Sequence, residues 1–144
     1  GAWAGESKDR SDLHLGDDAD ALIAAVATRG GGRVIVLTQI PGAVLMPWKD
    51  SVAGILVMFM AGQETGSAWA DVLFGDHVPA GRLPLMIPAS ERDTIVITEN
   101  LSVVYAEGLR TSYRNPDFKA AFPFGHGLTY TTFEYYPAHT IADC

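Results

Sequence analysis

The chain has 144 residues, 48% of them hydrophobic and 19% charged, which suits one folded domain with a buried core rather than a disordered chain. Seventeen acidic and ten basic side chains give a formal net charge of −7. That charge repels phosphate groups and argues against a nucleic-acid partner. The longest apolar run, residues 52–61, is about half the length of a bilayer span, so no membrane span is predicted.

The first half of the chain predicts helices and strands in alternation. Acidic residues followed by apolar residues at helical spacing predict a helix over Asp18–Thr28, which the three glycines at residues 30–32 end. Continuous apolar runs predict strands over Arg33–Thr38 and Val52–Phe59, each buried on both faces. A second helix is expected between residues 62 and 76. The apolar side of that helix consists of Ala68, Trp69, Val72 and Leu73.

These elements predict an α/β fold, a three-layer α/β/α sandwich with a mostly parallel sheet. Gly75 is expected to end the second helix in a left-handed conformation. An edge strand is expected over Leu83–Ile87. The last third is rich in Tyr, Phe, Gly and Pro, and this composition predicts irregular structure that packs through aromatic rings.

Metal, cofactor and disulfide sites receive no support from the sequence. No His, Cys or carboxylate cluster has the spacing of a metal site, and the glycines at residues 30–32 lack the Lys-Ser or Lys-Thr of a phosphate loop, so we predict neither a metal nor a cofactor. The one cysteine, Cys144, cannot form a disulfide within the chain. The sequence opens with Gly1 and shows neither an initiator Met nor the pattern of a signal peptide, so we expect the native N-terminus to lie upstream.

Three stretches carry a family resemblance. Residues 5–10 read Gly-Glu-Ser-Lys-Asp-Arg and lead to Asp-Leu-His-Leu at residues 12–15; residues 61–66 read Ala-Gly-Gln-Glu-Thr-Gly and begin a motif that reaches residue 84; residues 122–133 begin Phe-Pro-Phe-Gly-His-Gly. In this order they resemble glycoside hydrolase family 3, particularly its β-glucosidases. The resemblance implies that residues 1–135 are part of the family's C-terminal sandwich domain, incomplete on its N-terminal side, with residues 136–144 as a tail.

The resemblance also implies an activity, the hydrolysis of terminal β-D-glucosyl residues with retention, on a β-glucoside or an oligosaccharide. In such enzymes an N-terminal (β/α)8 barrel supplies an aspartate nucleophile, and a loop of the sandwich supplies the acid/base. Glu6 matches the acid/base, although Ser7 replaces the glycine that usually follows it. No segment matches the nucleophile, so the barrel is expected in the same chain or in another one, and the isolated 144 residues are expected to be inactive.

Each candidate site residue has a functional and a purely structural interpretation. Glu6 is either the acid/base or a solvated loop glutamate. Asp9 and Arg10 either shape the loop, through an ion pair or backbone hydrogen bonds, with Arg10 able to contact sugar, or are surface charges. Trp3 is either a platform on which a sugar stacks or part of the core.

Later candidates lie between the second strand and the second helix. Gln63 and Glu64 either support the acid/base loop or, for Glu64, match the positive end of the helix dipole. Asp71 and Asp76 are interpreted as helix-end and turn residues. His126 is interpreted as part of a packing turn rather than as a catalytic base.

A second hypothesis is a non-catalytic structural or interaction subunit that has kept the sandwich without the barrel. Missing first strands would leave an open sheet edge, and a protein partner would then cover it. The resemblance to secreted and vacuolar glycosidases favours an extracellular or vacuolar compartment, but the sequence itself carries no localisation signal.

Overall fold

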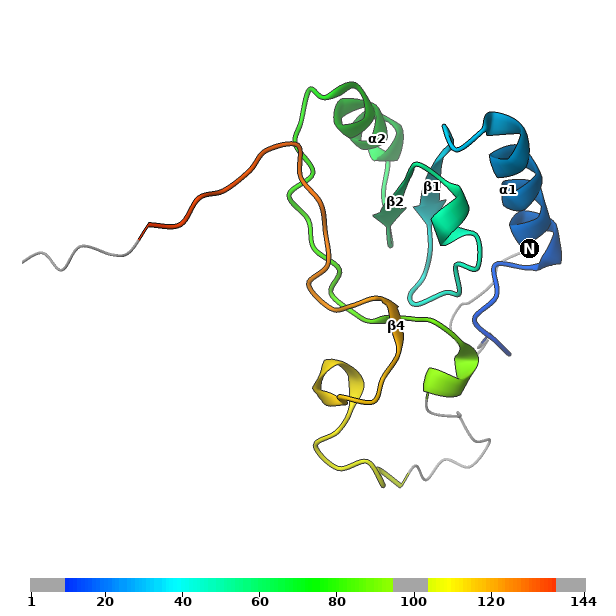
Figure 1. The fold of residues 1–144 in the computed structure, drawn as a ribbon, viewed down its shortest axis with the longest axis vertical. Coiled ribbons are helices and arrows are strands. Elements are labelled where there is room, and N and C mark those ends of the chain that lie inside the picture. The colour runs from blue at the N-terminus through cyan, green and yellow to red at the C-terminus, as the bar shows by residue number, and fades with distance from the viewer. Residues whose placement is uncertain (1–9, 95–103, 137–144) are drawn as a thin grey trace, which may run out of the picture.

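The computed structural model describes residues 10–94 and 104–136, which form an α/β fold (Figure 1). The helices and strands are α1 (Asp17–Gly30), β1 (Ile35–Gln39), β2 (Gly54–Met58), α2 (Thr65–Phe74), β3 (Ile87–Pro88) and β4 (Ala120–Phe122). Single 3-10 turns are η1 (Lys49–Ser51), η2 (Glu91–Asp93) and η3 (Ser112–Arg114). Neither α1 nor α2 has the length and hydrophobicity that a bilayer crossing requires.

Both predicted helices are confirmed, and glycine ends each of them. The predicted helix over residues 18–28 is α1, which is slightly longer, and Gly31 follows it in the left-handed conformation with φ 57°. Gly75 takes the same conformation after α2, with φ 85°, and its backbone N–H donates to the carbonyl of Val72. Left-handed backbone is favourable for glycine because glycine has no Cβ, so these stops follow from the sequence.

The two predicted apolar strands are also confirmed and pair in parallel. Ile35 lies opposite Gly54 and Gln39 lies opposite Met58, so β1 and β2 are in register over their whole length. The connection between them contains η1 and most of the buried core. The core comprises Leu15, Ile40, Val44, Met46, Trp48 and Ile87, with side chains of α1 and the sheet packed against it.

The expectation that β1 is buried on both faces is wrong. Its exposure alternates: Thr38 is buried, whereas Ile35 is 52% exposed and Leu37 is 37% exposed. Successive side chains of a strand point to opposite faces. Within the described residues one face of β1 packs on the core, and the other keeps apolar side chains open to solvent.

The predicted edge strand over Leu83–Ile87 is wrong in extent, because only Ile87 of that range is in a strand. Ile87 and Pro88 form β3, which pairs antiparallel with β4. Pro84 lacks a backbone N–H and interrupts a regular ladder. Leu83 instead bonds to a turn, donating its N–H to the carbonyl of His126 and accepting from the N–H of Gly125.

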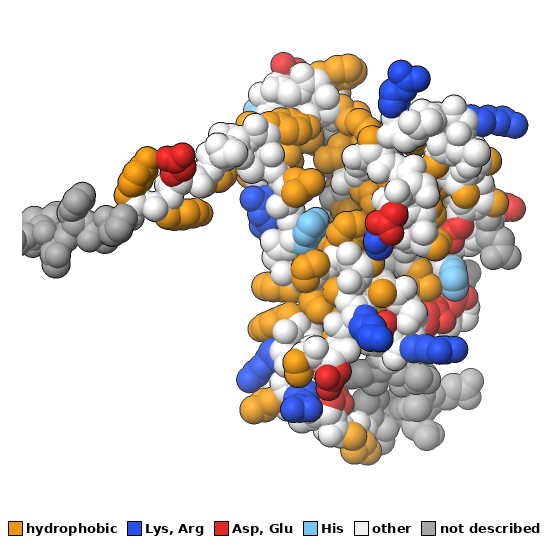
Figure 2. Space-filling view, in the orientation of Figure 1, with side chains coloured by type: hydrophobic (Ala, Val, Ile, Leu, Met, Phe, Trp, Pro, Cys, Tyr) orange, Lys and Arg blue, Asp and Glu red, His pale blue; other side chains and the backbone are white. Residues whose placement is uncertain are grey.

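The last third of the described chain is irregular and uses aromatic contacts, as predicted. The Tyr113 and Phe124 rings stack with centroids 4.7 Å apart, and the Phe122 and His126 rings lie 5.2 Å apart. Other aromatic side chains extend into solvent, and Figure 2 shows apolar side chains along the arm that leaves the body near its C-terminal end. The exposed aromatic residues of this arm are Tyr130, Phe133, Tyr135 and Tyr136.

Gly127 lies in close contact with Gly81 and Arg82 of the segment after α2. We expect that no side chain fits at position 127. A Cβ at Gly127 would lie 2.7 Å from Arg82 Cδ and 2.8 Å from the backbone oxygen of Gly81. We therefore expect Gly127→Ala to lower the free energy of unfolding by about 1–3 kcal/mol, measured by urea denaturation. Gly81→Ala is the matched control, because its Cβ would meet nothing within 4 Å. Equal midpoints for the two variants would contradict this account.

Candidate functional site

The polar loop that carries the first candidate site continues into an irregular segment that the structure holds firmly. This anchored segment, residues 10–15, lies just before α1. Arg10 Nη1 donates to the backbone oxygen of Ala43 at 3.0 Å. The carbonyl of Leu13 accepts from the N–H of Leu45 at 2.8 Å, and the Leu15 side chain is buried in the core. The segment is therefore bound to the connection between β1 and β2 at its start, middle and end.

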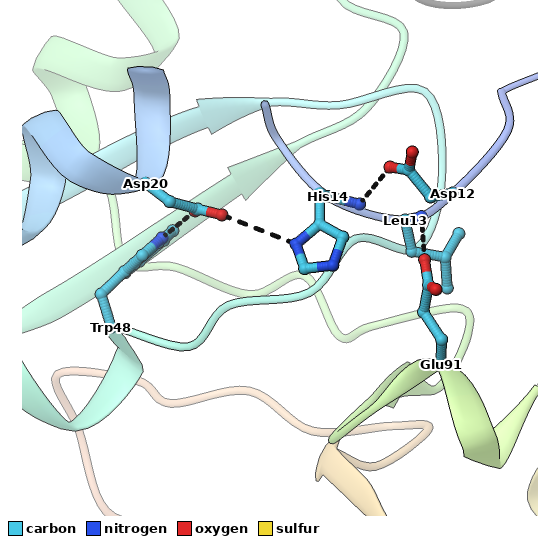
Figure 3. A network of polar contacts seen from close by, with 6 residues as sticks. All are labelled: Asp12, Leu13, His14, Asp20, Trp48 and Glu91. Carbon is cyan, nitrogen blue, oxygen red and sulfur yellow. Dashed lines mark hydrogen bonds and ion pairs between the residues drawn. The ribbon is translucent and has the colours of Figure 1, made fainter. Parts of the chain in front are cut away.

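A second set of contacts holds the middle of the anchored segment. Glu91, on η2, accepts the backbone N–H of Leu13 at its Oε1 at 2.6 Å, although the two residues are 78 positions apart (Figure 3). The carboxylate of Asp12 accepts the N–H of His14 at 3.0 Å and the hydroxyl of Ser11 at 3.0 Å. These two hydrogen bonds favour the ionised form and hold the pKa of Asp12 below its usual value.

Asp20 links the anchored segment to α1 and the core. Its Oδ1 accepts the indole N–H of Trp48 at 2.7 Å, and its Oδ2 lies 3.9 Å from His14 Nδ1. Figure 3 shows the Asp20 carboxylate between the two rings. Trp48 is only 4% exposed, so its N–H needs a partner inside the protein, and Asp20 supplies it. The Asp20 carboxylate thus joins the first turn of α1 to the end of the anchored segment.

The predicted site residues fall into three groups. Trp3, Glu6 and Asp9 lie outside the described residues. Arg10 is half-buried and makes the backbone hydrogen bond to Ala43 given above. Gln63 and Glu64 lie elsewhere, before α2. Among the described residues, no hydrogen bond or ion pair joins either of these two to the anchored segment.

Gln63 and Glu64 line an open hollow of about 470 Å³ between the end of β2 and the start of α2. Both side chains are exposed, and Gln63 Nε2 is 3.4 Å from Glu64 Oε1. Glu64 precedes the first residue of α2 but makes no side-chain cap hydrogen bond. The remaining lining is small or apolar: Met58, Ala61, Gly62, Thr65 and Ala68. Within the parts of the chain that the structure describes, no three His, Cys, Asp or Glu side chains gather as a metal site would require.

No pattern in the sequence predicted that Glu91, Asp20 and Trp48 help to hold the anchored segment. In the sequence, Asp20 is only one of several acidic residues at the start of a predicted helix. Trp48 follows Pro47 in a connection with no periodic pattern, and Glu91 lies in a polar stretch far along the chain. Only the fold brings these side chains to the anchored segment.

Comparisons with known proteins identify the family of this chain. The sequence matches the glycosyl hydrolase family 3 C-terminal domain over residues 1–130. The chain therefore belongs to glycoside hydrolase family 3, through its C-terminal domain.

Relatives of the chain are named β-glucosidases. It is 40% identical over 147 residues to a probable β-glucosidase H of Aspergillus fumigatus, with 97% of this chain covered, and 42% identical over 144 residues to a β-glucosidase of Rhizobium radiobacter, with 92% covered. The chain spans only 18% of the length of each relative.

A solved structure gives the same result for the fold. The β-glucosidase of Kluyveromyces marxianus superimposes with a TM-score of 0.84 at 34% identity, over 92% of this chain and 16% of that one. The predicted α/β sandwich class is confirmed by this match together with the parallel pairing of β1 and β2.

Proposed function

We propose that this chain is the acid/base-bearing part of a longer β-glucosidase, which hydrolyses terminal β-D-glucosyl residues with retention of configuration. The observation that carries the proposal is the 40–42% identity over nearly the whole chain to proteins named β-glucosidases. Because the chain spans 18% of those relatives, we propose that the remaining machinery, a barrel with the aspartate nucleophile, lies in the same polypeptide.

A retaining mechanism assigns one carboxyl group to this chain. In the first step the barrel carboxylate attacks the anomeric carbon, and the Glu6 carboxylic acid gives its proton to the glycosidic oxygen as the bond to the leaving group breaks. In the second step the Glu6 carboxylate takes a proton from water, which attacks the same carbon and releases glucose and the nucleophile. Trp3, Asp9, Gln63 and Glu64 are proposed to contact substrate or support the loop.

The described contacts support this assignment of Glu6 through its neighbour along the chain. Arg10 follows Glu6 by four residues, and its side chain is bound to the Ala43 carbonyl. A general acid must lie within hydrogen-bond reach of the oxygen that it protonates, so the loop that carries it requires a fixed point of attachment. The anchored segment supplies such an attachment immediately after the loop.

The exposed apolar side chains on one face of β1 favour a second surface that covers this face. Ile35 and Leu37 leave apolar side chains in solvent on the face away from the core. Covering such apolar side chains with another surface removes them from water, which is favourable. We propose that the rest of the same polypeptide covers this face.

The test uses the full-length protein and p-nitrophenyl β-D-glucoside, with proton NMR to identify the glucose anomer that is released first. We expect turnover, with β-glucose appearing before mutarotation produces the α-anomer, because two displacements at one carbon restore its configuration. The α-glucoside with the same leaving group is the control and is expected to react far more slowly. Absence of turnover would favour the non-catalytic hypothesis, and α-glucose as the first product would exclude retention.

A further inference from the structure

We propose that residues 132–136, the outer part of the C-terminal arm, add as a β-strand to the edge of a β-sheet that belongs to the rest of the same polypeptide. We call these five residues the arm strand. In this arrangement Phe133 and Tyr135 face inward, and Glu134 and Tyr136 face solvent. The inference rests on one part of the proposed function, the longer polypeptide, and not on the catalytic roles.

The backbone of the arm strand has no partner in the part of the chain that the structure describes. None of residues 132–136 makes a backbone–backbone hydrogen bond there, and the one side chain bonded to this backbone is Thr131, whose hydroxyl lies 3.5 Å from the carbonyl of Thr132. Figure 1 shows that the arm leaves the body beside α2 and runs outward. A row of free N–H and C=O groups is a surface on which another strand pairs.

The residues of the arm strand suit a strand better than a flexible linker. They read Thr-Phe-Glu-Tyr-Tyr, and β-branched and aromatic residues are enriched in strands. Chains that stay disordered contain few aromatic residues. Phe133 is 67% exposed and Tyr135 is 93% exposed, so the described residues leave both rings in water. Packing these rings against a sheet removes them from water, which is favourable.

The order of the side chains gives the arm strand two different faces. Successive side chains of a strand point to opposite faces, so Phe133 and Tyr135 share one face and Glu134 and Tyr136 share the other. The Tyr136 hydroxyl donates to Glu134 Oε2 at 2.6 Å, which agrees with a common face for these two residues. An apolar face and a more polar face are typical of a strand that packs on a core on one side only.

The start of the arm is fixed on the body. The Tyr130 hydroxyl donates to the carbonyl of Val72 in α2 at 2.7 Å. Just before it, Gly127 lies in close contact with Arg82. The arm strand therefore begins two residues after a fixed point, and this attachment reduces the freedom that the arm loses when it pairs.

The rest of the same polypeptide is favoured as the source of the sheet. The chain spans only 18% of the length of its β-glucosidase relatives, so most of a polypeptide of that length lies outside it. A sheet in the same polypeptide meets the arm at an effective concentration of about mM, whereas a second copy must find the arm at the concentration of the protein in solution. The covalent connection therefore favours pairing within one polypeptide.

The experiment measures amide hydrogen exchange of residues 132–136 in the full-length protein by mass spectrometry, at low and at high protein concentration. About half of these amides, those on the paired side, are expected to exchange at least about 100-fold more slowly than in a short peptide of the same sequence, at both concentrations. Tyr135→Ser removes a ring from the inner face and is expected to lower this protection about 10–100-fold. Tyr136→Ser makes the same chemical change on the outer face and is the matched control, with an expected change of less than about 3-fold.

The outcomes distinguish this inference from the proposed function. Exchange of the parent at the rate of the short peptide would overturn the inference and leave the catalytic proposal standing. Protection that appears only at high concentration would assign the sheet to a second copy, and equal losses in Tyr135→Ser and Tyr136→Ser would remove the inner and outer faces; either result overturns the inference. An intact mass that corresponds to 144 residues would overturn the longer polypeptide and the arm strand together.

Discussion

The Glu6→Gln variant of the full-length protein is expected to hydrolyse p-nitrophenyl β-D-glucoside about 10²–10⁴-fold more slowly than the parent. Glutamine has nearly the same shape but can neither donate the proton to the leaving oxygen nor take one from the attacking water. Added azide is expected to restore turnover of an activated substrate, because azide is already an anion and attacks the glucosyl-enzyme without a base. The product to be measured by NMR is β-D-glucosyl azide, with the configuration that two displacements produce.

Glu134→Gln is the matched control for this variant, because it makes the same chemical change at an exposed glutamate in the C-terminal arm. Its rate and its response to azide are expected to equal those of the parent. A Glu6→Gln variant with the activity of the parent would remove Glu6 from the mechanism. Slow turnover without any azide product would indicate that Glu6 has a structural role and is not the base.

Replacing Trp48 with alanine is expected to lower the free energy of unfolding by about 3–5 kcal/mol. The side chain is 4% exposed and belongs to the core cluster, so its removal leaves a cavity in the core. Its loss also leaves the Asp20 carboxylate without its 2.7 Å donor. The measurement is the shift of the urea unfolding midpoint of the full-length protein, with an unchanged slope.

Trp48→Phe separates packing from hydrogen bonding at this position. The phenyl ring fills most of the space but has no N–H, so the expected loss is about 1–3 kcal/mol, the usual effect of leaving a buried polar group without its partner. Equal stability of Trp48→Phe and the parent would mean that Asp20 finds another donor. An alanine variant as stable as the parent would contradict the burial of Trp48 in the core.

Local features of the sequence were sufficient for the elements of the first half. Helical spacing behind acidic residues predicted α1, glycine predicted both helix ends, and two apolar runs predicted a parallel pair of strands. Each of these signals acts over a few residues, where backbone conformation and side-chain period decide the structure. The boundaries of the edge strand failed because Pro84 prevents a regular ladder in the middle of an apolar run.

The sequence by itself determined the α/β class and the elements up to α2, and the resemblance of residues 5–10 to the family motif is the basis for proposing Glu6 as the acid/base. Only the tertiary structure decided which side chains hold the loop after Glu6, because their partners lie far along the chain: Ala43 is 33 positions from Arg10, Trp48 is 28 from Asp20, and Glu91 is 78 from Leu13. It also decided that one face of β1 stays open, since an apolar run looks the same in sequence whether one face or both are covered. Such contacts depend on how distant segments pack, and no local pattern of residues encodes them.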